Sequence, residues 1–186
     1  TEKEDKLRLQ ADNMEKLVKD LLNYSRPKEL KLSLVNINEL IDMSLDLVRL
    51  DSGITVERHY SETVPKKNGD IDQMRRVFTN ILENSIKSIK NEKGRIKIST
   101  RPLRPLSNFR RNTWLYIEFL DDGEGIPEDF LDKIFEPFFT TRKNEGGSGM
   151  GLAIVKQIIE SHKGFIDVTS KLGKGTIFNI RLPYLR

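Results

Sequence analysis

Asp121-Asp122-Gly123-Glu124-Gly125-Ile126 follows directly on Thr113 to Leu120, a stretch that alternates in the manner of a β-strand and is rich in apolar residues. Glycine permits a tight turn and a close approach of the backbone to a ligand. A carboxylate at the end of a strand can accept a hydrogen bond from an exocyclic amine such as that of adenine. An ordinary glycine-rich turn fits the same residues, so the prediction depends on what surrounds them.

A second glycine cluster, Gly146-Gly147-Ser148-Gly149-Met150-Gly151, runs straight into a helix expected from about Met150 to Ser161. Such a junction offers backbone N–H groups and the positive end of a helix dipole to phosphate. It lacks the GxGxxG spacing of dinucleotide-binding folds, and no GxxxxGK[ST] can be written across Gly173-Lys174-Gly175-Thr176. Each glycine cluster is weak by itself. Their order and their separation carry the prediction.

Asn80, Asn84 and Lys87 are spaced i, i+4 and i+7, so two amides and an ammonium share one side of a predicted helix. That side is polar within an otherwise apolar pattern. A carboxamide oxygen is a hard, neutral ligand suited to Mg²⁺, and an ammonium nearby suits phosphate. The trio could therefore hold the tail of a magnesium-bound nucleotide, or it could be an ordinary solvated face.

The remaining pattern alternates helices with strands. One capped helix is expected to start at Asn36 and to end near Gly53, and a second to start at Asp70 and to end at Gly94. Strands are expected at residues 54–60, 95–101, 113–120, 165–170 and 176–182, after a short apolar run at residues 32–35. Hairpins dominate the second half, which predicts an α/β two-layer sandwich with a mixed β-sheet under one helical layer.

The N-terminal region has the heptad pattern of one long helix with a narrow apolar seam. The seam consists of Leu7, Ala11, Met14, Val18, Leu21 and Ser25, and Arg26-Pro27 ends it. A lone helix of this length cannot bury its seam, so a partner helix outside this chain is expected. The predicted organisation is a partial helical unit at residues 1–26, a linker and first strand at 27–35, and one domain at 36–186.

Composition excludes several classes of function. The chain has 186 residues, of which 37% are hydrophobic and 32% charged, as in an ordinary soluble globular protein. No apolar run approaches the roughly 18–20 residues of a membrane span, so a cytoplasmic location without membrane contact is expected, although a longer parent could be membrane-anchored. Cysteine is absent, and His59 and His162 lie far apart, so disulfides, thiolate chemistry and a zinc site are not expected.

The formal net charge is +4, from 32 basic and 28 acidic residues. Arg101, Arg104, Arg110 and Arg111 lie in a stretch free of acids. A nucleic-acid surface would usually be broader than one such loop and would carry interleaved aromatic residues. A solvated basic loop is therefore expected, and no nucleic-acid partner.

Five segments in order resemble the sequence boxes of sensor histidine kinases. They are Asn80-Ile-Leu-Glu-Asn84, Asp121-Asp-Gly-Glu-Gly125, Phe135-Glu-Pro-Phe-Phe139, Gly147-Ser-Gly-Met-Gly151-Leu-Ala-Ile and Gly173-Lys-Gly-Thr176. The resemblance covers roughly Asn36 to Leu185 and implies the Bergerat ATP-binding fold shared with gyrase-type ATPases. Residues 17–25 resemble the second helix of the dimerisation and phosphoacceptor hairpin, and the lid after Phe139 is similar to the nitrogen-regulatory branch.

The resemblance implies ATP and Mg²⁺ as cofactors and a role for each matching residue. Asn84 would ligate Mg²⁺ with the help of Asn80, Lys87 would contact phosphate, and Asp121 would bind the adenine amine. Gly123 and Gly125 would shape the pocket, Thr176 would support the adenine side, and Arg142 and Lys143 of the lid are candidates for the phosphates. Phe135, Phe138 and Phe139 would gate the lid and dock it on the hairpin. The boxes complete the nucleotide-binding set with Ile126, Gly147, Gly149, Met150, Gly151 and Leu152.

Two comparisons with the family sharpen the expected chemistry. Hydrolysing members of the family have a glutamate four residues before the metal-binding asparagine. In this chain that position is Asn80, whose amide cannot act as a base. Glu83, beside Asn84, could serve only as a weak base. The family's phosphoacceptor histidine lies in a motif that is absent here, and His59 and His162 are expected to be surface or structural residues. The chain is thus predicted to bind Mg-ATP without phosphorylating itself, as part of a longer kinase whose sensor and first hairpin helix are missing from this sequence.

Several readings stay open at this stage. The leading one is the catalytic part of a two-component sensor kinase, which passes the γ-phosphoryl to a histidine on the hairpin of the homodimeric parent and then to a response-regulator receiver domain. The alternatives are a hydrolysing ATPase of the gyrase type, a non-catalytic ATP-binding scaffold and, resting only on the basic loop, a nucleic-acid-binding module.

Overall fold

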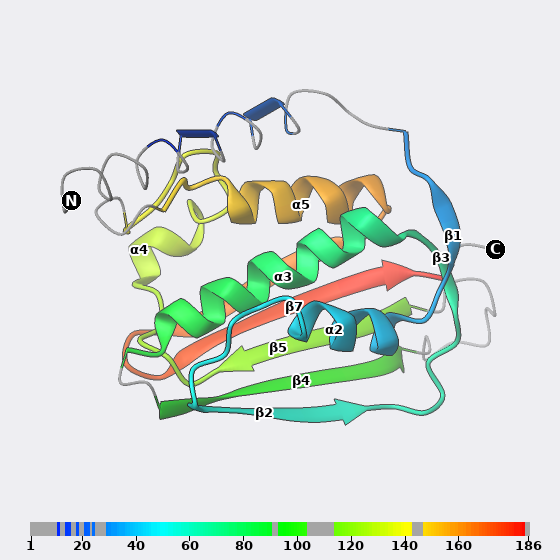
Figure 1. The fold of residues 1–186 in the computed structure, drawn as a ribbon, viewed down its shortest axis with the longest axis horizontal. Helices are drawn as coiled ribbons and strands as arrows, with labels where there is room; N and C mark the ends of the chain where they lie inside the picture. The colour runs from blue at the N-terminus through cyan, green and yellow to red at the C-terminus, as the bar shows by residue number, and fades with distance from the viewer. Residues whose placement is uncertain are drawn as a thin grey trace.

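The computed structural model describes residues 29–90, 93–103, 114–142 and 147–184, together with positions 11, 14, 15, 18, 21, 22 and 24. One layer is a β-sheet, and the main helices lie on one of its faces (Figure 1). This is the two-layer α/β architecture that the sequence predicts.

The main sheet has five strands in the order β2-β4-β5-β7-β6. They are β2 (Gly53–Tyr60), β4 (Lys93–Leu103), β5 (Trp114–Asp121), β7 (Gly175–Pro183) and β6 (Phe165–Lys171). The β2–β4 pair is parallel and the other pairs are antiparallel, which confirms the predicted mixed sheet. In the β5–β7 pair, Asp121 lies opposite Thr176, so the two glycine-flanked segments meet at one end of the sheet.

Three helices cover the sheet: α2 (Ile37–Leu45), α3 (Ile71–Ser88) and α5 (Gly151–Ser161). Their apolar faces pack on the side chains of the strands that point toward them. On β5 these are Leu115, Ile117 and Phe119, all fully buried, and α3 contributes residues such as Phe78, whose ring packs 5.8 Å from that of Phe119. This alternation along β5 is the strand period that the sequence displays.

The predicted helix starts are confirmed, whereas two predicted ends are wrong. The side chains of Asn36 and Asp70 accept hydrogen bonds from backbone N–H groups of the first turns of α2 and α3. Helix α2 ends at Leu45 rather than near Gly53, because the chain turns there to enter β2. Helix α3 ends at Ser88 rather than at Gly94, because Ile89 is already extended and leads into β4.

Two elements were not expected from the sequence. Strand β3 (Lys67–Asp70) pairs antiparallel with the expected β1 (Leu32–Val35) in a separate two-stranded sheet. Its residues Lys67-Asn-Gly-Asp70 carry no apolar alternation, so no pattern marks them as a strand. The short helix α4 (Glu128–Leu131) lies within the glycine- and proline-rich segment, where a single turn leaves no periodicity to detect.

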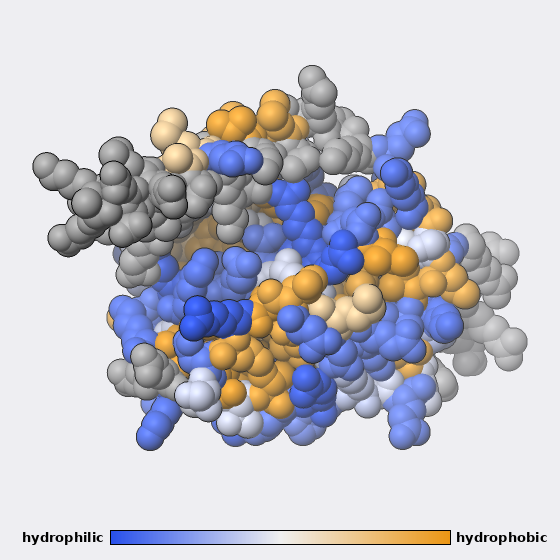
Figure 2. Space-filling view, viewed as in Figure 1, coloured by the Kyte–Doolittle hydropathy of each residue, from blue (hydrophilic) through white to orange (hydrophobic). Residues whose placement is uncertain are grey.

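The described N-terminal positions, which include Ala11 and Tyr24, are helical; the ends of the predicted helix lie outside the described residues. Met14, Val18, Leu21 and Leu22 are exposed there, and Figure 2 shows apolar side chains on the outer surface of this segment. The helix reaches the domain at Tyr24, whose carbonyl oxygen accepts a hydrogen bond from Gln157 of α5 at 2.9 Å. No helix among the described residues is long and apolar enough to cross a membrane.

Candidate functional site

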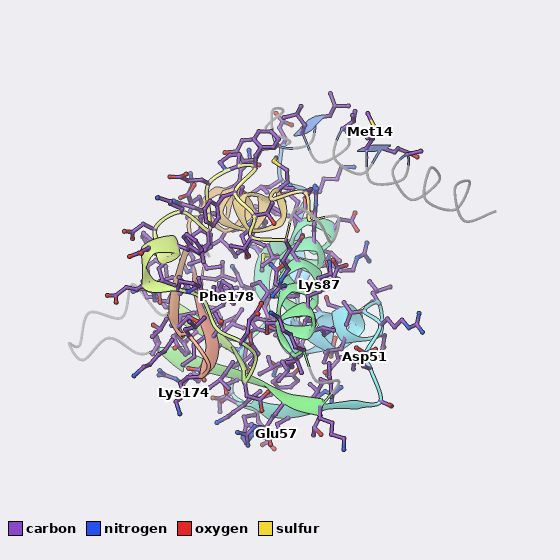
Figure 3. The ribbon with its side chains drawn as sticks, turned by 90° about the vertical axis from the view of Figure 1, so that its left-hand side faces the viewer. Met14, Asp51, Glu57, Lys87, Lys174 and Phe178 are labelled. Carbon is purple, nitrogen blue, oxygen red and sulfur yellow. The ribbon has the colours of Figure 1, made fainter. Side chains whose placement is uncertain are left out.

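A pocket of about 390 Å³ lies between α3, the end of the sheet and the segment that leads into α5. Figure 3 labels Lys87 on α3 and Phe178 on β7, which line it from two different elements. Most of the predicted site residues line this one pocket: Asn80, Asn84, Lys87, Asp121, Gly125, Ile126, Phe139, Arg142, Gly147, Gly149, Gly151, Leu152 and Thr176. Gly123 and Met150 are buried but do not line it. Lys143 lies outside the described residues.

Asp121 supplies a carboxylate that is only 2% exposed. Its Oδ1 accepts hydrogen bonds from Ser88 Oγ at 2.9 Å and from the Gly123 N–H at 3.0 Å, and its Oδ2 accepts one from Ser85 Oγ at 3.0 Å. Burial raises the pKa of Asp121, and these hydrogen bonds act in the opposite direction. The side chain is thus a fixed acceptor in the wall of the pocket.

Close packing explains why glycines follow Asp121. A Cβ on Gly123 would lie 2.0 Å from Ser88 Oγ. Gly125 has a positive φ of 72°, and a Cβ there would lie 2.2 Å from the carbonyl oxygen of Lys171. These glycines let the loop after β5 pass tightly between α3 and β6, which holds Asp121 in place.

The two asparagines line the same side of the pocket. Asn80 Nδ2 donates to the carbonyl oxygen of Arg76 at 2.8 Å, so the Oδ1 of the amide points the other way. A Cβ on Gly151 would lie 2.8 Å from that oxygen, so the glycine keeps the adjoining space open. Asn84 lies one turn further along α3 and also lines the pocket. Lys87 forms a long ion pair with Glu83, in which Nζ and Oε2 are 3.8 Å apart. Hard, neutral oxygens beside a cation fit a magnesium-bound phosphate.

The segment between β5 and α5 is tied to the rest of the pocket by charge. Arg142 donates to Glu124 Oε1 at 2.7 Å, and Lys90 pairs with the other oxygen of Glu124. Partial burial acts to raise the pKa of Glu124, but the hydrogen bonds from Lys90 and Arg142 outweigh it and lower the pKa. A cation is therefore held at the mouth of the pocket by a carboxylate that itself lines the pocket.

Aromatic and aliphatic side chains form the apolar wall. Phe139 packs edge-on against Phe130 with ring centroids 5.5 Å apart, beside Ile126, and Leu152 lies at the start of α5. Phe138 is half exposed and has a positive φ of 67°, and Gly149 packs against its backbone. A cleft that combines an apolar wall with convergent polar groups is typical of a small-molecule site. The gating role of the phenylalanines stays a prediction.

Some residues that line the pocket or hold its side chains were not among the predicted site residues. Ser85 and Ser88 hold Asp121, and Glu124 holds Arg142. The sequence feature that could have indicated the two serines is their position, three residues apart, on the otherwise apolar face of α3. Glu83, considered above as a weak base, also lines the pocket.

Both histidines lie away from the pocket lining. His162 is 1% exposed, its Nε2 accepts from the Asp70 N–H at 3.0 Å and its Nδ1 donates to the carbonyl oxygen of Ile158 at 2.8 Å. Burial lowers its pKa, so it is a neutral structural residue. His59 is more than half exposed on β2 beside Glu57. The sequence-based expectation for both residues is confirmed. The basic loop around Arg104, Arg110 and Arg111 lies outside the described residues.

A helix-covered mixed sheet with this pocket at its end defines an ATP-binding domain of the Bergerat class. The family described as "Histidine kinase-, DNA gyrase B-, and HSP90-like ATPase" matches residues 69–186, and the chain belongs to it. Within that family, its relatives place it with the catalytic domains of two-component sensor histidine kinases.

Two relatives are the sensor histidine kinase ZraS of Escherichia coli K12 and the sensory histidine kinase/phosphatase NtrB of Rhodobacter capsulatus. ZraS is 35% identical over 177 residues, which are 94% of this chain and 36% of the relative. NtrB is 38% identical over 166 residues, which are 85% of this chain and 45% of the relative. The chain thus spans less than half the length of each.

Two solved structures of histidine kinases have a similar fold. Full-length ShkA in complex with AMPPNP has a TM-score of 0.77 at 26% identity, covering 97% of this chain and 38% of that one. Histidine kinase ThkA in complex with the response regulator TrrA has a TM-score of 0.75 at 26% identity, covering 95% and 48%. The predicted fold and family are therefore confirmed.

Proposed function

We propose that this chain binds Mg-ATP in the pocket and forms the catalytic half of a histidine kinase. The γ-phosphoryl would pass to a histidine on a helical hairpin of the homodimeric parent kinase, and from there to an aspartate of a response-regulator receiver domain. The observation that carries the proposal is the convergence of a buried carboxylate, two amide oxygens and the glycine-lined start of α5 on one pocket. The ATP analogue bound to ShkA and the response regulator bound to ThkA support it.

Each part of the pocket suits one part of the nucleotide. Asp121 would accept the adenine amine, with Thr176 beside it and with Ile126 and Phe139 against the base. The N–H groups in the first turn of α5 have no partner within the helix, and Gly149, Gly151 and Leu152 line the pocket there, so they can face phosphate. Asn80 and Asn84 would hold Mg²⁺, which neutralises phosphate charge when bound. Lys87 and Arg142 are the nearby cations.

The chain's own residues favour transfer over hydrolysis. Phosphoryl transfer needs alignment and charge stabilisation more than covalent help from the protein. Asn80 occupies the position where a hydrolysing relative would need a carboxylate base. The Nδ2 of its amide already donates to the carbonyl oxygen of Arg76. The acceptor histidine would come from outside this chain, because His162 has both ring nitrogens engaged and His59 lies on β2.

A second candidate function is slow ATP hydrolysis, which one observation favours. Glu83 lies between the two asparagines on α3 and lines the pocket, where a carboxylate could orient a water molecule. Its ion pair with Lys87 keeps it near the phosphate-binding side. Release of phosphate by the chain alone would support this candidate.

The test is a calorimetric titration with ATP and with GTP, each with and without Mg²⁺, while released phosphate is followed. Saturable, magnesium-dependent binding selective for ATP, without phosphate release, is expected. Asp121→Ala should abolish this selective binding and leave the fold intact, and Asn84→Ala should remove its magnesium dependence. Asp51→Ala, at an exposed position, is the matched control and should bind like the unaltered chain. Retained affinity in Asp121→Ala would overturn the pocket assignment.

The transfer step has its own test. The chain is mixed with radiolabelled ATP and a separately produced helical hairpin that carries a histidine, followed by a receiver domain. Label that appears on the hairpin, is stable in base and labile in acid, and then moves to the receiver domain would support the kinase. Binding of ATP without any label on the hairpin would point to a non-catalytic scaffold.

A further inference from the structure

The carboxylate of Asp121 is held by two serine hydroxyls that the proposed reaction does not itself require. Ser85 and Ser88 come from adjacent turns of the buried face of α3, whereas Asp121 ends β5. Ser85 is 1% exposed and Ser88 is 7% exposed. Each donates to a different oxygen of the carboxylate, at 3.0 and 2.9 Å. Both oxygens are therefore pinned, and the plane of the carboxylate is fixed relative to the pocket.

The hydrogen bonds also act on the charge state of the acceptor. Ser88 Oγ lies 2.7 Å from the carbonyl oxygen of Ser85 as well as 2.9 Å from Asp121 Oδ1, and its single proton can serve only one of them fully. A bond to an ionised oxygen is the stronger choice. Ser85 Oγ has Asp121 as its acceptor, and the Gly123 N–H adds a third donor. These three donors and the backbone N–H of Thr176 favour the ionised form of the carboxylate, whereas burial raises its pKa.

An ionised, immobile carboxylate is selective for the base that it meets. It can only accept hydrogen bonds, so it suits the 6-amino group of adenine and repels the 6-oxo oxygen of hypoxanthine or guanine. A carboxylate free to rotate could follow a donor at another ring position, and a protonated carboxyl could donate to a 6-oxo group. A pocket built around a fixed acceptor rejects a base that lacks the matching donor, because the charged oxygen then faces a lone pair of the base instead of an N–H group.

We propose that Ser85 and Ser88 are positioning residues that determine base specificity, by holding Asp121 as a fixed acceptor for a 6-aminopurine. This inference rests on the proposed nucleotide-binding function and adds to it the determinants of substrate class. Other charged groups that line the same pocket are Glu83 and Lys87 of α3, Glu124, and Arg142. Glu124 is paired with Arg142 and Lys90 and Glu83 with Lys87, and the serines are the side chains bonded to the carboxylate itself.

The experiment compares the dissociation constants of ATP and inosine triphosphate between pH 6.0 and 7.5. Their ratio isolates the base, because both ligands carry the same phosphates and bind the same magnesium. The unaltered chain is expected to prefer ATP over this pH range. In the Ser85→Ala, Ser88→Ala double variant the ratio should fall at least tenfold, and most at pH 6.0, because the carboxyl then rotates and takes up a proton more easily.

Two further variants separate positioning from a general loss of structure. Ser44→Ala removes another fully buried serine hydroxyl, on α2, which donates to the Leu40 carbonyl, and it should leave the ratio unchanged. Ser85→Thr keeps a hydroxyl at the key position and should retain the preference for ATP. If Ser85→Thr does not fold, as judged by circular dichroism, the two alanine variants decide the question alone.

The outcomes are distinct. An unchanged ratio and pH profile in a folded double variant would overturn the role of the serines while leaving the proposed function intact. Failure of the unaltered chain to bind ATP would overturn the proposed function first. A ratio that falls equally in the Ser44→Ala control would show that loosened packing, not the bonds to Asp121, causes the effect, and would also reject the inference.

Discussion

At Gly151, the methyl group of an alanine would collide with one of the two asparagines proposed to bind magnesium. A Cβ there would lie 2.8 Å from Asn80 Oδ1, closer than carbon and oxygen can approach. The other side of the Asn80 amide is fixed by its bond to Arg76 O, so the side chain cannot simply retreat. The backbone itself accepts alanine, because Gly151 is the first residue of α5 and has no positive φ.

Gly151→Ala is therefore expected to weaken Mg-ATP binding about tenfold, which corresponds to roughly 1.4 kcal/mol, by displacing the Asn80 amide. The stability of the fold should change by less than about 1 kcal/mol, because alanine favours a helix more than glycine does. Calorimetry and urea unfolding measure the two effects. Gly69→Ala, whose Cβ would meet nothing nearer than 3.8 Å, is the control for binding. Equal ATP affinity in Gly151→Ala and the unaltered chain would argue against a role for Asn80 in the site.

Sequence spacing locates some of the pocket residues and misses others for a physical reason. Asn80, Asn84 and Lys87 share a helix, whose fixed period brings them to one side whatever the rest of the fold does. Ser85 and Ser88 lie on the buried face of that helix, where a serine is also compatible with plain packing. Their meaning depends on Asp121, which is 33 and more residues away in sequence. Only the docking of α3 on β5 brings these groups together.

The loop after β5 and the segment before α5 are joined by the ion pair of Glu124 with Arg142. This carboxylate engages Arg142 and Lys90 at once and is itself 31% exposed. Arg142, with 22% of its side chain exposed, is the more buried partner. Nucleotide phosphates entering the pocket would compete with Glu124 for these cations and would be repelled by its charge.

Glu124→Gln should therefore raise the affinity for Mg-ATP by about two- to five-fold, a size typical of a partly exposed ion pair. The gain should shrink as salt is raised from 0.05 to 0.5 M, because mobile ions screen exposed charges. Glu128→Gln, on the exposed side of α4, is the control of equal charge change. Weaker binding in Glu124→Gln at every salt concentration would show that Glu124 orients Arg142 for the nucleotide rather than competing with it.

Local signals define most elements, and neighbouring elements define the rest. Side-chain caps at Asn36 and Asp70 mark helix starts because the bond is made within three residues. The ends of α2 and α3 depend instead on where β2 and β4 must begin, which an apolar pattern does not encode. Strand β3 exists because β1 offers it a hydrogen-bonding edge, not because its own residues favour a strand. Such pairings are visible only in three dimensions.

The small β1–β3 sheet contains a buried lysine that affects the stability of the entire fold. Lys67 is 2% exposed, and no described residue gives its Nζ a hydrogen-bond partner. Burial lowers the pKa of Lys67 to about 8. At neutral pH the folded protein must therefore keep a charged amine in a place that favours the neutral form.

This burial makes global stability depend on pH in a defined direction. Between pH 8 and the ordinary lysine value of 10.5, the unfolded chain binds a proton that the folded chain has released, so stability rises with pH. Burial acts oppositely on tyrosine: it raises the pKa of Tyr184 to about 12, and burial together with Asp42 raises that of Tyr60. Above about pH 10 the unfolded chain loses tyrosine protons that the folded chain retains, and stability falls.

The free energy of unfolding, measured with urea, should thus increase by about 2 kcal/mol from pH 7.5 to pH 9.5 and should decrease above pH 10. His162 does not disturb this window, because its lowered pKa places its titration below pH 7. Lys67→Met keeps the apolar stem and removes the charge, so it should abolish the rise and be more stable than the unaltered chain at pH 7.5. Since Lys67 does not line the pocket, ATP binding should be unchanged in this variant. A rise of the same size in Lys67→Met would assign the pH dependence to another group.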